Sequence, residues 1–179
     1  MKRAYALLLA AVVACLAVAA DASFEQYSEE LQKKERLIDS DHQAREPLLQ
    51  TLDANCNVNN ALKAGLTGDP KSFADSLDAA QKKLQSVAQR LPGISEKGRF
   101  KQFVKKGVAP TLHLRSGEFL PIRNGDEMLK AIAVLAQQSA DAIERIKTGK
   151  GGDEDFSLIA TNSAIIPQLI LEFYNLQTA

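Results

Sequence analysis

The stretch from Asp69 to Leu91 constrains the fold most, because its apolar residues recur at the spacing of a single helix face. Asp69 suits a helix N-cap, Pro70 suits the first helical position, and Pro92 and Gly93 supply a stop after Leu91. The apolar stripe between these ends consists of Phe73, Leu77, Ala80, Leu84, Val87 and Leu91. A stripe of this kind must be buried against partner helices of similar length. The sequence therefore predicts a helical bundle.

Three other segments have apolar residues at helical spacing, and they cover residues 47–65, 126–148 and 154–177. The first of them is joined to the helix at residues 70–91 by a loop of a few residues containing Gly65 and Gly68. A loop this short predicts that the two helices run antiparallel. Together the four segments predict an all-α fold, an antiparallel four-helix bundle.

The last of these segments is apolar on nearly every side, and Glu172 is its only charged residue after Asp155. Its length would fit a membrane span. Polar residues interrupt the apolar run, however, including Asn162 and Gln168, and Pro167 lies inside it. We therefore predict a centrally buried helix that is kinked near Pro167.

Two segments outside the bundle helices complete the predicted fold. Residues 23–38 have helical spacing but few apolar residues, which predicts an N-terminal helical arm that docks only partly. Residues 94–123 form an irregular crossover between the second and third bundle helices. Within this crossover, alternating residues on either side of Ser116 and Gly117 indicate a short hairpin.

The first 22 residues have the three parts of an export signal. Lys2 and Arg3 are followed by an uncharged run rich in alanine, leucine and valine, and an Ala-x-Ala site predicts cleavage between Ala22 and Ser23. We therefore expect residues 1–22 to be a signal peptide, residues 23–179 to be one domain, and the protein to be extracytoplasmic. The alternative is a lipid anchor at Cys15, which the continuing apolar run after this cysteine disfavours.

Composition narrows the partners and the means of stabilisation. The chain has 22 basic and 22 acidic residues, so its overall charge predicts no polyanionic partner, and we expect no nucleic-acid binding. Removal of the signal leaves Cys56 as the one cysteine, which excludes an intrachain disulfide in the mature chain. Hydrophobic packing must therefore stabilise the domain.

No recognised catalytic or cofactor motif appears in the chain. Cys56 has no identifiable base beside it, which predicts an inert buried thiol. The bundle resembles those of b-type cytochromes, which hold haem with a methionine and a histidine. However, neither His42 nor His113, which precedes Met128, falls clearly on a helix face. We expect no enzymatic activity, no haem or other cofactor and no metal site.

The crossover carries a local excess of positive charge that the rest of the chain lacks. From Glu96 to Arg123 there are seven basic residues and two acidic ones, interleaved with aromatic residues. Cations and aromatics in this arrangement suit an anionic lipid surface, a glycan or an acidic protein patch. The alternative is that the phenylalanines dock the crossover on the bundle while the lysines are solvated. The candidate binding surface comprises Lys97, Arg99, Phe100, Lys101, Phe103, Lys105, Lys106, Arg115 and Arg123.

An asparagine cluster marks the first bundle helix, with asparagine at positions 55, 57, 59 and 60. Asparagine is a poor helix former, and we expect these side chains to be solvated on the outer face, with a polar lining as the alternative. Two function classes fit the whole sequence. The first is an exported non-enzymatic interaction protein of the cell envelope or extracellular space, which binds a protein or an anionic surface, including peripheral contact with a membrane. The second is a bundle that holds an apolar ligand or cofactor between its helices, with the asparagine cluster as the polar end.

Overall fold

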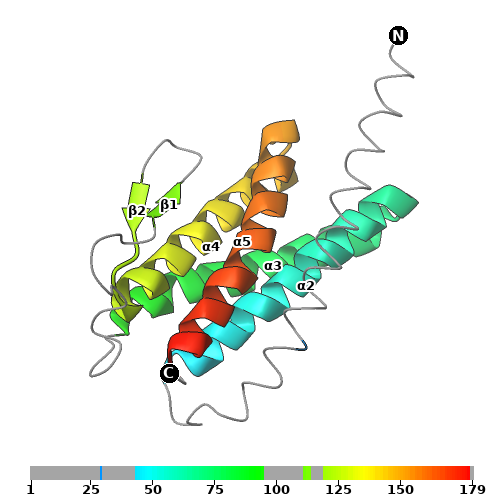
Figure 1. Cartoon of the computed structure of the whole chain (residues 1–179). Coiled ribbons are helices and arrows are strands. Elements are labelled where there is room, and N and C mark those ends of the chain that lie inside the picture. The colour runs from blue at the N-terminus through cyan, green and yellow to red at the C-terminus, as the bar shows by residue number, and fades with distance from the viewer. Residues whose placement is uncertain (1–28, 30–42, 95–110, 114–118, 178–179) are drawn as a thin grey trace.

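The computed structural model describes residue 29 and residues 43–94, 111–113 and 119–177. Four long helices pack against one another within these ranges (Figure 1). They are α2 (Arg45–Thr67), α3 (Pro70–Arg90), α4 (Gly125–Lys147) and α5 (Asp153–Gln177). The fold is the all-α four-helix arrangement that the apolar spacing predicts. Each predicted helix is present, with ends shifted by at most two residues.

The turn between α2 and α3 shows why the first two helices form a tight pair. Gly68 ends α2 with φ 73°, a left-handed conformation that glycine adopts without a steric penalty. Asp69 then caps α3, because its carboxylate accepts a hydrogen bond from the backbone N–H of Ser72 at 3.0 Å. A second bond from the Ser72 hydroxyl, 2.6 Å long, holds the pKa of the Asp69 carboxyl below its ordinary value.

The predicted stripe on α3 is part of the core. Leu77, Ala80, Leu84, Val87 and Leu91 are at most 3% exposed. Phe73 is partly buried and lies against Phe156 of α5, with ring centroids 6.5 Å apart. The spacing of apolar residues thus identified the correct face of this helix. The 3₁₀ turn Leu91–Gly93 follows α3 directly, as Pro92 and Gly93 predict.

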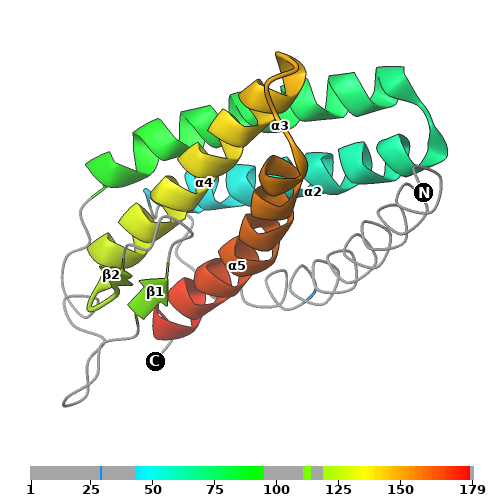
Figure 2. The same ribbon diagram turned by 90° about the horizontal axis from the view of Figure 1, so that it is seen from above.

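The helices follow one another around the bundle in chain order, and α5 returns to contact α2 (Figure 2). The α4 helix packs against α3 on one side and α5 on the other, and it also contacts the 3₁₀ turn Leu91–Gly93. Small residues at Ala136, Ser139 and Ala140 are all buried there, which is consistent with the close approach that their size predicts.

The prediction that α5 is centrally buried is wrong. Ile159, Ile166 and Ile170 face the core, but Leu158 and Leu169 are only partly buried. Among the described helices, α5 packs against α4 and makes a smaller contact with α2. Part of a helix that is apolar almost all round is therefore left outside the core. The helix continues through Pro167.

The short hairpin predicted in the crossover is present beside the start of α4 (Figure 1). Strands β1 (Thr111–His113) and β2 (Phe119–Pro121) pair antiparallel, with Leu112 opposite Leu120. Asn124 then caps α4 by accepting a 2.9 Å hydrogen bond from the Glu127 N–H. The predicted signal peptide, the N-terminal arm and most of the crossover lie outside the described residues.

Candidate functional site

The predicted basic surface can be located at one residue only. Arg123 lies just before α4, is well exposed, and is 3.9 Å from the Glu127 carboxylate. The other eight members of this surface, from Lys97 to Arg115, lie outside the described residues. The basic surface therefore stays a prediction. The same holds for cleavage between Ala22 and Ser23 and for lipidation of Cys15.

The residues weighed as cofactor ligands or nucleophiles do not form a site in the described part of the chain. Met128 is buried in the core at 4% exposure, and Cys56 is partly buried on α2. His113 belongs to β1, and His42 lies outside the described residues. No cluster of three or more histidine, cysteine or acidic residues suited to a metal ion occurs among the described residues.

The asparagine cluster on α2 is the main correction to the sequence-based prediction. Asn55 is 2% exposed and Asn59 is 6% exposed, whereas Asn57 is partly exposed and Asn60 is exposed. The cluster was expected on the outer face, but positions 55 and 59 are one helical turn apart and share the side of α2 that meets α5. Two of the four amides are therefore interior groups.

Asn55 has a specific structural partner on α5. Its Nδ2 donates a hydrogen bond to the backbone oxygen of Ser163 at 3.2 Å. Pro167 lies four residues after Ser163 and has no N–H, so it cannot make the helical hydrogen bond to this carbonyl. The Asn55 amide supplies the donor that Pro167 lacks. An in-helix proline and a buried asparagine on another helix are thus explained by the same bond.

Asn59 differs from Asn55 because its carbonyl oxygen Oδ1 is buried and has no hydrogen-bond partner in the described structure. Buried acceptors in proteins are nearly always bonded, and an unbonded one is unfavourable. The adjacent buried residues of α2, Val58 and Leu62, are apolar and offer no donor side chain. Asn59 Oδ1 is therefore a buried acceptor without a partner, on a part of α2 whose neighbouring buried residues are apolar.

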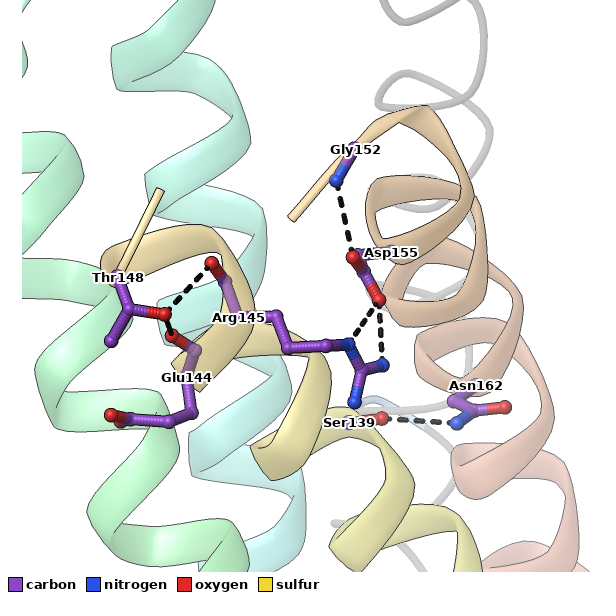
Figure 3. A network of polar contacts seen from close by, with 7 residues as sticks. All are labelled: Ser139, Glu144, Arg145, Thr148, Gly152, Asp155 and Asn162. Carbon is purple, nitrogen blue, oxygen red and sulfur yellow. Dashed lines mark hydrogen bonds and ion pairs between the residues drawn. The ribbon is translucent and has the colours of Figure 1, made fainter. Parts of the chain in front are cut away.

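The side-chain amide of Asn162 on α5 is also buried, and it forms hydrogen bonds to α4 (Figure 3). Asn162 Nδ2 donates to Ser139 Oγ at 3.1 Å and to the Leu135 oxygen at 3.2 Å. Near the turn between the same helices, Arg145 Nε and Nη2 donate to one oxygen of Asp155 at 2.9 and 2.6 Å. These bonds raise the pKa of the Arg145 guanidinium above its ordinary value. They fix α5 on α4.

Ion pairs also join α2 to α3 and α3 to α4. Glu46 and Arg90 join α2 to α3 at 2.6 Å, and this contact holds the pKa of the Glu46 carboxyl below its ordinary value. Asp78 and Lys147 join α3 to α4 at 2.5 Å, which likewise lowers the Asp78 pKa. The contact between α2 and α5 includes the Asn55 hydrogen bond and is the least extensive of the contacts between neighbouring helices. The contact line between these two helices, called here the α2–α5 seam, is the least strongly fixed.

The side of α5 that faces away from the bundle carries partly buried apolar residues next to exposed polar ones. We call it the outer face of α5. Thr161, Gln168 and Glu172 are exposed on it and are flanked by partly buried apolar residues. Its members are Leu158, Thr161, Ile165, Gln168, Leu169 and Glu172.

By length and composition, α5 could also cross a membrane. The stretch Asp153–Phe173 has a mean hydropathy of 1.3, and 44% of its most apolar window is buried inside the protein. Core helices of water-soluble domains have the same properties, so hydropathy alone does not distinguish the two. The buried part of this stretch is the side of α5 that packs on α4 and α2. The rest of the stretch lies on the outer face.

Comparison with known proteins gives no further indication of function. No family model matches the chain, and neither the curated proteins nor the solved structures include a significant match. Any function of this protein is therefore inferred from its own residues.

Proposed function

We propose that this protein is an exported, non-enzymatic interaction protein that binds a protein partner through the outer face of α5. The observation that carries the proposal is the partial exposure of an apolar helix face with a single charge, Glu172. Surface patches of apolar residues bordered by polar ones are typical of protein contacts. Export is proposed from the leader at residues 1–22, and N-terminal sequencing of the functional protein should return Ser23.

The bundle geometry suits recognition of a partner helix. Leu158, Ile165 and Leu169 follow one another at spacings of seven and four residues, so they line one edge of the outer face over three turns. An amphipathic helix can lay its apolar side along such a row, with anchors at the same spacing. The basic crossover is proposed as a second surface that would add attraction to an acidic partner.

Charge substitutions on the outer face test this proposal without disturbing the core. Thr161 and Gln168 are exposed, so the double variant Thr161→Lys, Gln168→Lys should keep its helicity and melting temperature. Binding should nevertheless fall by at least about tenfold, because docking would bury two unpaired charges. The measurement is affinity capture from envelope and extracellular extracts, with bound proteins quantified by mass spectrometry.

The matched control places the same charges on α3. Gln85 and Gln89 are exposed there, and Gln85→Lys, Gln89→Lys should leave capture unchanged. A third variant, with Lys101, Lys105 and Lys106 changed to Gln, reports on the crossover and should weaken capture mainly at low salt. Equal capture by the α5 and α3 variants would remove the outer face as the binding surface.

A further inference from the structure

The unbonded oxygen of Asn59 lies where the bundle is least strongly fixed. Antiparallel helices pair residues in opposite order, so a step of four residues forward along α2 matches a step of four backward along α5. Asn55 bonds the Ser163 oxygen, Asn59 lies one turn after Asn55 on α2, and Ile159 lies one turn before Ser163 on α5. Ile159 is 2% exposed, and Val58 and Leu62 beside Asn59 are also buried. A single polar acceptor thus lies among apolar side chains of two helices.

The α2–α5 seam can separate more easily than the other helix contacts. Arg145 and Asp155 fix α5 to α4, Asp78 and Lys147 fix α3 to α4, and an ion pair at Glu46 fixes α2 to α3. The contact between α2 and α5 is the least extensive of the contacts between neighbouring helices, and it includes the neutral hydrogen bond at Asn55. Local opening follows the weakest set of contacts. A molecule that enters between helices therefore meets the lowest resistance at this seam.

The chemistry of Asn59 selects the class of molecule. Its Oδ1 is a neutral amide oxygen, which accepts a hydrogen bond from a hydroxyl or an amide N–H. An ion would lose its hydration in exchange for one neutral oxygen among apolar residues, which is unfavourable. An alkyl chain gains by burial against Val58, Leu62 and Ile159. The complementary ligand has an uncharged donor at one end and an apolar body.

We propose that the α2–α5 seam binds a neutral amphiphile, with its hydroxyl or amide N–H donating to Asn59 Oδ1 and its alkyl chain between α2 and α5. This site is separate from the outer face of α5. The inference goes beyond the proposed protein contact, and it holds or fails independently of that contact. Asn59 would then remain buried without an internal donor because the ligand supplies the donor.

The test uses two probes that differ in one hydrogen-bond donor. They are 1-dodecanol and dodecyl methyl ether, and their binding to the full mature chain is measured by displacement of an environment-sensitive fluorophore and by native mass spectrometry. We expect 1-dodecanol to bind the unaltered protein at least about tenfold more tightly than the ether, since only the alcohol can donate to Asn59 Oδ1. Equal affinity for the two probes, or binding of neither, would overturn the proposal.

A pair of variants locates the donor contact. Asn59→Leu should reduce 1-dodecanol binding to the level of the ether, whereas Asn60→Leu, at an exposed neighbour of the same type, should leave it unchanged. Full 1-dodecanol affinity in the Asn59→Leu variant would also overturn the proposal. The probe comparison needs no substitution, so it decides the question even where a variant fails to fold. The variant Thr161→Lys, Gln168→Lys should retain the alcohol preference, which separates this site from the protein contact.

Discussion

At the scale of single residues, Pro167 and Asn55 show how a local defect in one helix determines a side chain on another. Pro167 leaves the Ser163 oxygen without its helical donor, and Asn55 provides one from α2 at 3.2 Å. A buried carbonyl without a partner is unfavourable by about 1–3 kcal/mol. The asparagine is a poor helix former in isolation. Its place in α2 is explained by the proline that it serves.

A double-mutant cycle tests this pairing. Asn55→Leu should lower the free energy of unfolding by roughly 1–3 kcal/mol, because it leaves the Ser163 oxygen buried and unbonded. In the Pro167→Ala background the new N–H can bond that oxygen, so the same change should be less harmful by on the order of 1 kcal/mol. Chemical denaturation of the four proteins measures the coupling. Additive effects would show that the two residues do not share the carbonyl, and Asn57→Leu serves as the uncoupled control.

Leu84 tests the packing of the stripe on α3. It is 1% exposed in the middle of the stripe, and buried Leu→Ala changes typically lower stability by about 2–5 kcal/mol. Leu66 provides the matched control, because it is 42% exposed and should tolerate alanine with a change below about 0.5 kcal/mol. Urea titration of both variants gives the comparison. A loss below about 0.5 kcal/mol at Leu84 would mean that this face is not buried.

At the scale of helices, apolar spacing predicted the elements well and their burial less well. The stripe from Leu77 to Leu91 could be assigned because an apolar side chain recurs there every three or four residues. The environment of α5 could not be assigned in this way, since a helix that is apolar all round has no moment to mark its inner side. The extent of its contacts with α4 and α2 decided its burial, and these contacts are a property of the whole bundle.

The prediction that the asparagine cluster is solvated failed for a related reason. Helix propensity indicates that Asn55 and Asn59 are unfavourable in α2, but it does not indicate which face they occupy or whether a partner is present. The in-helix Pro167 was the available signal, because the carbonyl four residues before it needs a donor from elsewhere. Combining the two observations would have predicted the contact between α2 and α5.

Carboxylates at the helix contacts predict the acid sensitivity of the bundle. Hydrogen bonds from Arg90, Ser72 and Lys147 lower the pKa values of Glu46, Asp69 and Asp78 in the folded state. A lowered folded pKa gives stability that is fully present above the unfolded pKa and is lost as pH falls through the folded one. We therefore expect the melting temperature to be constant near neutral pH and to decrease as the pH drops below about 4.

The triple variant Glu46→Gln, Asp69→Asn, Asp78→Asn checks the source of this effect. It should be less stable than the unaltered protein at pH 7 and should lose less on acidification, because three titrating contacts are gone. Thermal melts followed by circular dichroism from pH 7 to pH 2.5 give both curves. Parallel curves would assign the acid sensitivity to other groups.

At the scale of the whole molecule, the four helices form one bundle, and the proposed binding surface lies on α5. Contacts among α2, α3 and α4 include ion pairs and the α3 stripe. One side of α5 packs inward, and its other side carries partly buried apolar residues and exposed polar ones. The fold class could be predicted from sequence because packing demands are written in apolar spacing. The proposed binding surface could not be predicted from sequence, because apolar spacing does not show which side of α5 has no neighbouring helix.

The central claim is that the outer face of α5 contacts a protein partner, and site-specific photo-cross-linking in the intact cell tests it most directly. A photoreactive residue at Thr161 should give a cross-linked product with a discrete protein, and the product should disappear when Gln168→Lys is added. The same photoreactive residue at Gln85 on α3 should not give that product. Identical products from both positions, or none from Thr161, would contradict the claim.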